Sequence, residues 1–131
     1  MTNHHFSPRL FQSTAPFSHF VEHGGTGFTA GIIGQRRDDG LLVSDGVAEQ
    51  CEAMMDNLET LLDELGLGFS DLVRTTLYLT DYKDFEVINA VYARHLSEPF
   101  PVRTTIQVAA LPLGAKVQID AVVALRRTGS G

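Results

Sequence analysis

The feature that most constrains the fold is a change in hydrophobic period along residues 44–98. Apolar side chains first recur at steps of three and four residues, as on one face of a helix: Val47, Cys51, Met54, Met55, Leu58, Leu61, Leu62 and Leu65. Residues 73–79 then alternate with period two and are rich in β-branched and aromatic side chains, which predicts a strand. A second helical stripe follows over residues 85–96. Two one-sided helices and a strand therefore have to share one core.

Residues at the ends of these segments predict where each helix begins and ends. Ser44 or Asp45 can cap the start of the first helix, and Gly66 can end it. Asp84 is the corresponding cap of the second helix. That helix cannot continue through the prolines at 99 and 101, because proline lacks an amide donor and biases its predecessor toward extended geometry.

The region before the first helix predicts a short β-hairpin. Residues 27–33 and 41–43 carry β-forming residues, and a turn sequence at residues 37–40 separates them. Residues 1–15 show no regular pattern, so we expect an irregular N-terminal segment. At the other end, residues 126–131 have the composition of a flexible tail.

The C-terminal third predicts a second hairpin, with strands over residues 103–110 and 116–125 around a turn at residues 111–114. Its alternation assigns one apolar face to Thr104, Ile106, Val108 and Ala110 together with Val117, Ile119, Ala121 and Val123. The polar face would carry Arg103, Thr105 and Gln107 together with Gln118 and Asp120. On this prediction Arg103 and Gln118 lie on the same side of the sheet.

The order of elements predicts a single α+β domain over residues 1–131. Strand, strand, helix, strand, helix, strand, strand is satisfied by a mixed β-sheet with both helices packed on one face. The opposite face, with Arg74, Thr76 and Tyr78, is half apolar, which indicates that it meets other subunits rather than bulk water. We therefore expect an oligomer.

Composition narrows the class of protein further. No apolar run approaches the roughly 20 residues of a membrane span, and the N-terminus lacks the basic-then-apolar order of a secretory signal, so we expect a cytoplasmic protein without a membrane partner. The single Cys51 allows no disulfide framework within one chain. A net charge of −6 argues against nucleic-acid binding, which needs clustered Lys and Arg.

Arg103 is the strongest candidate for binding a ligand. It follows Pro101 at the start of a predicted strand in an acidic chain, and its planar guanidinium can hold a carboxylate through two parallel hydrogen bonds. The alternative is a structural ion pair at a strand end or a subunit boundary. Asn89 borders the apolar stripe of the second helix, so it either stabilises a loop or faces a site.

Other reactive residue types favour structural interpretations. His4 and His5 lie in the N-terminal segment, and His19 and His23 have no third ligand nearby, so we expect no metal site. Cys51 falls on the apolar stripe of the first helix and is interpreted as a core residue rather than a nucleophile.

Several separated motifs together resemble one known family. They include NL at 57–58, GL at 66–67, LVRTTLYLTD at 72–81, NAVY at 89–92, PVRTT at 101–105 and ALPLGA at 110–115. Their order and spacing are similar to those of the RidA/YjgF family of enamine/imine deaminases, from about residue 16 to residue 125. The resemblance implies a chorismate-mutase-like α+β protomer assembled as a homotrimer, with three sites in the clefts between subunits. It implies neither a metal nor an organic cofactor.

The resemblance also implies roles for individual residues. Arg103 matches the arginine that binds the substrate carboxylate, Asn89 matches the polar residue that helps to order the site, and Gly31 matches a glycine whose backbone borders the pocket. Thr104 and Thr105 follow Arg103 in the same motif and complete the expected substrate-binding residues. Thr105 stands where the family often has a cysteine.

Two positions depart from the family pattern. Phe17 stands where the deaminases carry a tyrosine, so it keeps the ring and lacks the hydroxyl. Gln118 stands where they carry the glutamate thought to handle the attacking water, and an amide cannot take up a proton at neutral pH. Gln118 can still place a water, and Asp120, two residues along on the same predicted face, is a candidate for the missing acid or base.

The function predicted from these residues is hydrolytic deamination of small 2-imino or enamine carboxylates to a 2-oxo acid and ammonia, with Arg103 and Gln118 as the catalytic residues. One alternative is a non-catalytic trimer that uses the same anion pocket as a ligand sensor or partner-binding module. Another is a family hydrolase for a different enamine, since Phe17 makes the pocket more apolar. The ribonuclease activity attributed to some relatives fits poorly with a net charge of −6.

Overall fold

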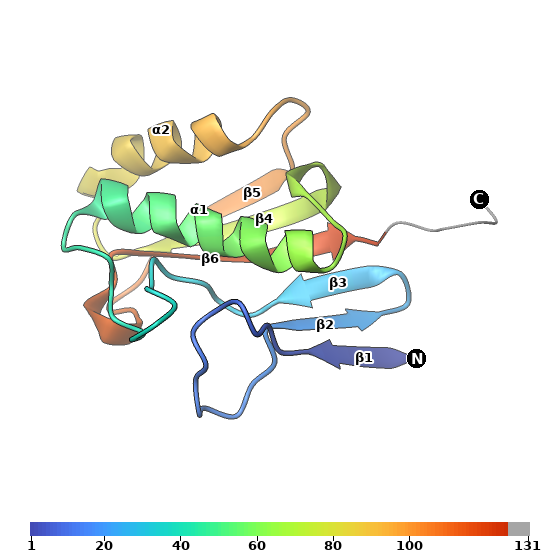
Figure 1. Ribbon diagram of the computed structural model, residues 1–131. Helices are drawn as coiled ribbons and strands as arrows, with labels where there is room; N and C mark the ends of the chain where they lie inside the picture. The colour runs from blue at the N-terminus through green and yellow to red at the C-terminus, as the bar shows by residue number, and fades with distance from the viewer. Residues whose placement is uncertain (126–131) are drawn as a thin grey trace.

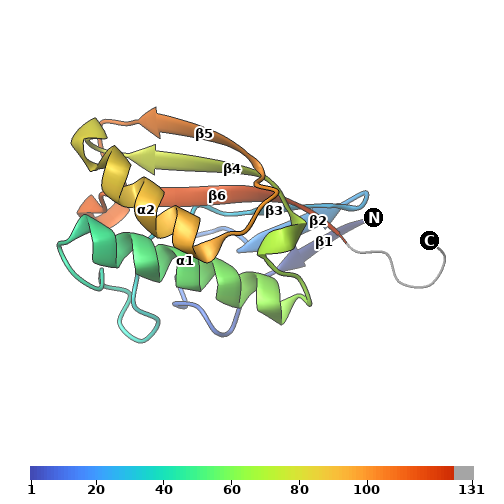
Figure 2. The same ribbon diagram turned by 90° about the horizontal axis from the view of Figure 1, so that it is seen from above.

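Two helices cover one face of a six-stranded mixed sheet in the computed structural model, which describes residues 1–125 (Figure 1). The strands are β1 (Thr2–His5), β2 (Phe20–His23), β3 (Thr26–Thr29), β4 (Leu72–Leu79), β5 (Val102–Gln107) and β6 (Val117–Ala124). The helices are α1 (Val47–Glu64) and α2 (Phe85–His95), and short 3-10 turns lie at Phe69–Asp71, Tyr82–Asp84 and Pro112–Gly114. The helices lie side by side over the sheet (Figure 2). The predicted α+β class, with both helices on one face of a mixed sheet, is confirmed.

The strand order is β1-β2-β3-β6-β4-β5, in which β4 and β5 are parallel and all other neighbours are antiparallel. The predicted C-terminal hairpin is therefore wrong, because β4 lies between β5 and β6. The chain passes from β4 through α2 before it returns as β5, which is the long connection that a parallel pair requires. Hydrophobic alternation divides the side chains of a strand into two sets on opposite faces, but it does not identify the neighbouring strand.

The predicted faces of β5 are also wrong. Arg103 aligns with Thr75 of β4 and Thr105 aligns with Leu77, and both of these β4 residues are completely buried beneath the helices. Paired residues on adjacent strands point to the same face of a sheet. Arg103 and Thr105 therefore point toward the helices.

The open face of the sheet, which the helices do not cover, carries the β5 side chains that were predicted to face the core. Thr104 and Ile106 align with Thr76 and Tyr78 of β4, which align in turn with Asp120 and Gln118 of β6. Gln118 and Asp120 thus point away from the helices, on the side opposite to Arg103. The alternation of β5 misled the prediction because β5 is an edge strand, where neither face is fully buried. Ile106 therefore remains 42% exposed on the open face, and an arginine can lie on the helix side, at the flank of α2.

The N-terminal region contains more β-structure than predicted. Residues 2–5 form the edge strand β1 rather than an irregular segment, and β1 pairs with β2, which the sequence did not reveal. The predicted strand 27–33 shortens to β3, and the predicted strand 41–43 reduces to one bridge between Leu42 and Gln35. Each of the two missed strands has only four residues, and β1 consists of polar residues, so neither shows a clear alternation. The predicted tail 126–131 lies outside the described residues.

The helix ends agree with the predictions except at one cap. The N-cap of α1 is Gly46, so neither Ser44 nor Asp45 occupies that position, and Ser44 Oγ instead accepts a hydrogen bond from the amide of Gly46. Gly66 ends α1 as predicted, with a φ of +74° that glycine adopts without strain. Asp84 is the N-cap of α2 as predicted, although its side chain makes no capping hydrogen bond.

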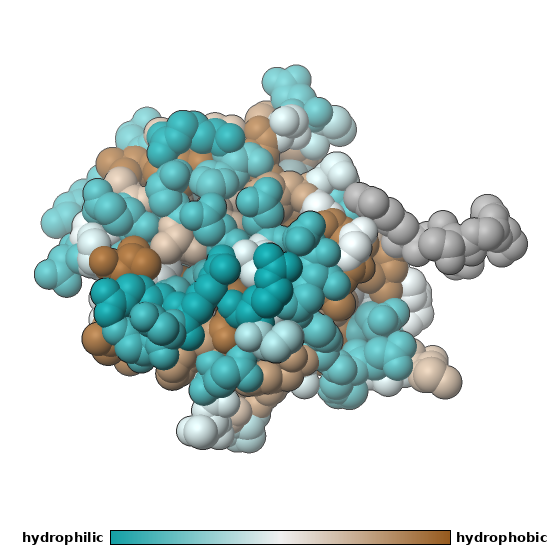
Figure 3. Space-filling model, in the orientation of Figure 1, coloured by the Kyte–Doolittle hydropathy of each residue, from teal (hydrophilic) through white to brown (hydrophobic). Residues whose placement is uncertain are grey.

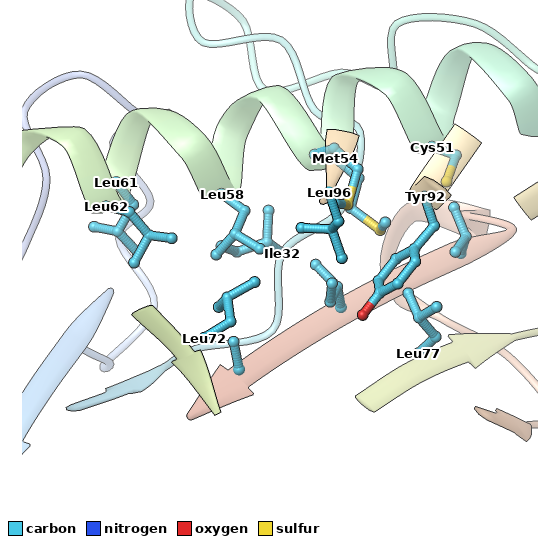
Figure 4. Packing of buried hydrophobic residues seen from close by; sticks show 14 of the residues in the cluster. Ile32, Cys51, Met54, Leu58, Leu61, Leu62, Leu72, Leu77, Tyr92 and Leu96 are labelled. Carbon is cyan, nitrogen blue, oxygen red and sulfur yellow. The ribbon is translucent and has the colours of Figure 1, made fainter. Parts of the chain in front are cut away.

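The core lies between the helices and the sheet (Figure 4). Met54, Leu58 and Leu61 of α1 are fully buried and belong to one cluster with Leu77 of β4. Cys51 belongs to the same cluster, and burial raises the pKa of its thiol to about 12, as expected of a core residue. The side of the protein that α1 turns to solvent is largely hydrophilic (Figure 3). Neither described helix is both long and apolar enough to cross a membrane.

Candidate functional site

Arg103 lies on β5 where that strand passes beneath α2. Its Nη2 donates a hydrogen bond to Oδ1 of Asn89 (2.6 Å), and its Nε donates one to Oγ1 of Thr105 (3.0 Å). The guanidinium carbon lies 4.9 Å from the ring centre of Tyr92 and 5.6 Å from that of Phe85. Two hydrogen bonds and two aromatic rings therefore hold the guanidinium in place.

The groups that hold Arg103 are uncharged, so its positive charge is not neutralised locally. Asn89 and Thr105 are neutral, and none of the ion pairs among residues 1–125 involves Arg103. The alternative of a structural ion pair thus finds no partner in the described part of the protomer. Neither hydrogen bond uses Nη1, which leaves the end of the guanidinium available to hold a carboxylate.

A hollow of about 330 Å³, which we call the Arg103 hollow, opens beside this guanidinium. Its lining residues are Asn89, Tyr92, Ala93, Phe100, Pro101 and Arg103. Tyr92 presents its ring and not its hydroxyl, because the hydroxyl points toward the sheet and is hydrogen-bonded to Oγ1 of Thr75 at 2.7 Å (Figure 4). The Arg103 hollow therefore combines one cation with mostly apolar walls, as small-molecule sites do.

A second hollow, of about 630 Å³, has Gln118, Gly31 and Phe17 in its lining, and we call it the Gln118 hollow. A Cβ added to Gly31 would lie 2.7 Å from Nε2 of Gln118, so a glycine lets the loop pass this close to the carboxamide. The ring of Phe17 packs edge-on against Phe6 and remains 42% exposed. Among residues 1–125, no ionisable side chain lines this hollow.

Asp120 has a partner other than Gln118. Its Oδ2 accepts a hydrogen bond from the hydroxyl of Tyr78 at 2.7 Å. This hydrogen bond, together with partial burial, raises the pKa of Tyr78 to about 12. Asp120 lies on the same face of β6 as Gln118, as predicted, but it lines neither hollow.

The structure sorts the predicted site residues into two groups. Arg103, Asn89 and Thr105 form one group, and Phe17, Gly31 and Gln118 form the other. Thr104 belongs to neither group, because it is exposed on the open face of the sheet. The two groups do not meet within one protomer, since Arg103 and Gln118 leave the sheet on opposite faces.

Tyr92 and Leu113 are among the lining residues that the sequence did not single out as site residues. Tyr92 follows Asn89 by three positions, and this helical spacing places both on one side of α2, so a signal for Tyr92 was present. Leu113 lines the Gln118 hollow from a turn in which its φ is +60°. Sequence patterns give no signal for Leu113, because leucine rarely adopts this conformation.

The histidines of the N-terminal region have structural partners. His5, on β1, contacts a carboxylate oxygen of Glu64 at the end of α1 (2.5 Å). Nδ1 of His19 accepts a hydrogen bond from the amide of Ser7, and burial lowers the pKa of His19. Among residues 1–125, no group of three or more His, Cys, Asp or Glu side chains could hold a metal ion.

Comparison with known proteins shows which family this chain is similar to. The family model described as endoribonuclease L-PSP matches residues 8–125. The chain is 38% identical over 107 residues to the human 2-iminobutanoate/2-iminopropanoate deaminase, covering 82% of this chain and 78% of that protein. It is 36% identical over 110 residues to the chloroplastic Reactive Intermediate Deaminase A of Arabidopsis thaliana, covering 84% of this chain but only 59% of the plant protein's length.

A solved structure shows the same architecture. The crystal structure of E. coli TdcF with bound serine matches with a TM-score of 0.86 and 28% sequence identity, over 95% of this chain and 99% of that chain. The chain therefore belongs to the RidA/YjgF family, whose model carries the endoribonuclease L-PSP description.

Proposed function

We propose that this protein hydrolyses small 2-imino or enamine carboxylates to a 2-oxo acid and ammonia, with Arg103 binding the carboxylate. The observation that carries the proposal is the guanidinium itself, which is held by neutral groups beside the open Arg103 hollow. Two relatives named as deaminases, one of them for 2-iminobutanoate and 2-iminopropanoate, support this reaction class. The serine bound in the related E. coli structure is itself a small carboxylate, close in size to 2-iminobutanoate.

The proposed site is completed by a second copy of the chain. Arg103 and Gln118 leave the sheet on opposite faces, so a ligand held by Arg103 meets a Gln118 only across a subunit boundary. The open face offers apolar surface for such contact, since Phe28 is 46% exposed and Val102 is 60% exposed. These features support a homotrimer with its sites between subunits, as the family resemblance implies.

The chemistry assigns separate tasks to the two groups. Water adds to the imine carbon, the nitrogen of the resulting aminol is protonated, and ammonia leaves as the carbonyl forms. Arg103 holds the carboxylate next to the reacting carbon, and the Gln118 carboxamide orients the water. Because Gln118 cannot accept the proton, the water proton passes through solvent or to the substrate nitrogen. We therefore expect a slower reaction than a carboxylate at this position would support.

A non-catalytic carboxylate-binding trimer is the second candidate. The observation that favours it is the lining of the Gln118 hollow, which has no ionisable side chain among residues 1–125 to act as acid or base. Such a protein would bind the same small carboxylates at Arg103 and leave them unchanged.

The test compares wild type, Arg103→Ala and Gln118→Glu for release of 2-oxobutanoate from freshly generated 2-iminobutanoate. Wild type should accelerate release, Arg103→Ala should not, and Gln118→Glu should be faster by about 10²-fold or more if it restores a general base. Arg94→Ala is the matched control, because Arg94 is an exposed arginine of α2 that lines neither hollow.

The outcomes separate the two candidates. Activity in Gln118→Glu alone would support the binding trimer for the natural chain. If wild type were inactive and Arg103→Ala bound 2-oxobutanoate as well as wild type did, both candidates would be wrong.

A further inference from the structure

Charge is distributed very unevenly in the walls of the two hollows. Arg103 is the only charged residue that lines the Arg103 hollow, and no charged residue lines the Gln118 hollow, among residues 1–125. A ligand that bridges them would therefore meet one cation at one end and uncharged walls elsewhere. A second carboxylate on the ligand would lose its water without gaining a cation.

Exposed aromatic and aliphatic side chains stand at the mouths of both hollows. Phe100, in the Arg103 hollow, is 53% exposed next to Pro101. Phe17 and Leu113, in the Gln118 hollow, are 42% and 59% exposed. Within one protomer these three side chains are uncovered, and in the proposed site a ligand with an apolar side chain would pack against them.

Leu113 has a backbone conformation that residues other than glycine rarely adopt. Its φ of +60° and ψ of +18° lie in the left-handed region, where the Cβ of any residue other than glycine comes too close to the following carbonyl oxygen. A strained residue usually gains buried contacts in return, but Leu113 remains mostly exposed within the protomer. Backbone strain of this kind clusters at ligand-binding sites. Leu113, an exposed apolar side chain that lines the Gln118 hollow, is therefore a candidate for contact with a ligand.

We propose that the site prefers monocarboxylates with a branched aliphatic or aromatic side chain, and that Leu113 is the residue that sets this preference by excluding a second negative charge. The proposal rests on the proposed function, because it takes Arg103 as the carboxylate anchor. The substrate class is then 2-imino acids of larger apolar amino acids rather than imino dicarboxylates.

The experiment measures binding of stable 2-oxo acids by calorimetry at fixed ionic strength. The ligands are 2-oxobutanoate, 4-methyl-2-oxopentanoate, phenylpyruvate and the dicarboxylate 2-oxoglutarate. We expect 4-methyl-2-oxopentanoate to bind about tenfold tighter than 2-oxobutanoate, since it buries two more carbon atoms. Phenylpyruvate should also bind tighter than 2-oxobutanoate, and 2-oxoglutarate should bind more weakly than all three monocarboxylates.

Leu113→Lys tests the residue directly. The added ammonium should tighten 2-oxoglutarate binding at least tenfold and weaken the binding of 4-methyl-2-oxopentanoate. Leu113→Ala should reduce the preference for 4-methyl-2-oxopentanoate over 2-oxobutanoate without tightening the binding of 2-oxoglutarate. Leu41→Lys is the matched control, because Leu41 is 58% exposed and lines neither hollow. It adds the same charge and should leave all four affinities unchanged.

The results distinguish this inference from the proposed function. If wild type bound 2-oxoglutarate as tightly as 4-methyl-2-oxopentanoate, and Arg103→Ala abolished both, the side-chain preference would be wrong while the carboxylate anchor stood. Equal responses of Leu113→Lys and Leu41→Lys would likewise overturn the role of Leu113. If Arg103→Ala bound the 2-oxo acids as tightly as wild type did, the proposed function itself would be wrong.

Discussion

Gly31 and Gly34 lie in the same loop, yet an added methyl group should have different consequences at the two positions. A Cβ on Gly34 would lie 2.3 Å from the carbonyl oxygen of Gln50 and 2.8 Å from its Cα, which are backbone atoms of α1. A Cβ on Gly31 would lie 2.7 Å from Nε2 of Gln118, the far end of a flexible side chain. Neither glycine has a positive φ, so the difference is steric and not conformational.

The magnitude for Gly34→Ala follows from these contacts. A separation of 2.3 Å is about 1 Å shorter than ordinary van der Waals contact, so the loop must move away from α1, and such overpacking costs about 1–3 kcal/mol. The same movement stretches the hydrogen bonds that Nδ2 of Asn57 donates to the carbonyls of Ile33 (3.2 Å) and Gln35 (3.0 Å). Weakening them adds about 1 kcal/mol, so we expect a total loss of about 2–4 kcal/mol.

Gly31→Ala should change stability far less. The Gln118 side chain can rotate away, and alanine restricts the unfolded chain more than glycine does, so the free energy of unfolding should stay within about 1 kcal/mol of wild type. The displaced carboxamide should nevertheless alter ligand binding in the Gln118 hollow. Thus one alanine should act on stability and the other on function.

Urea unfolding followed by circular dichroism, at one protein concentration, measures both variants. Calorimetric binding of 2-oxobutanoate reports the state of the hollow. The reasoning would be refuted by a Gly34→Ala variant as stable as wild type, or by a Gly31→Ala variant that loses as much stability as Gly34→Ala.

Two further predictions concern titratable groups. The hydrogen bond to Asp120 raises the pKa of Tyr78 to about 12, so the stability contributed by the neutral phenol is complete below the usual tyrosine pKa of 10.0 and is lost as pH rises toward 12. Tyr78→Phe should therefore flatten the fall in the free energy of unfolding over that pH range, measured in urea, and an unchanged slope would contradict the assignment. Burial raises the pKa of the Cys51 thiol to about 12, so a thiol reagent at about pH 8 should label the native protein only as slowly as it opens. Rapid labelling of native protein, at the rate seen in urea, would show that Cys51 is not a core residue.

The helical stripes and the strand at β4 were predictable because their periodicity is local and strong. The apolar residues of α1 recur on one face, and the structure buries that face. The edge strand β1 was not predictable, because its four polar residues gain their hydrogen bonds from β2 rather than from any pattern of their own. Parallel pairing of β5 with β4 was missed for a similar reason, since adjacency in the sheet depends on the path of the chain through α2.

Residue type and helical spacing predicted Arg103 and Asn89 as site residues, and the family resemblance implied the others. Arg103, Asn89 and Thr105 were all singled out, and the structure joins them by two hydrogen bonds. Gly31 and Gln118 were singled out separately, and the structure brings them into direct proximity. Asp120 was placed on the correct face of β6, but its hydrogen bond to Tyr78 depends on the pairing of β6 with β4.

The sequence by itself determined the class of the fold and the family, and it singled out the arginine that we propose to hold a carboxylate, because each of these depends on residue type and local spacing. Only the tertiary structure decided which strands are neighbours and which face the side chains of β5 take. Strand register placed Arg103 beneath α2 and Gln118 on the open side, a separation that the alternation of one strand cannot reveal. It is this register that divides the two groups of site residues and makes a second copy of the chain part of the proposed site.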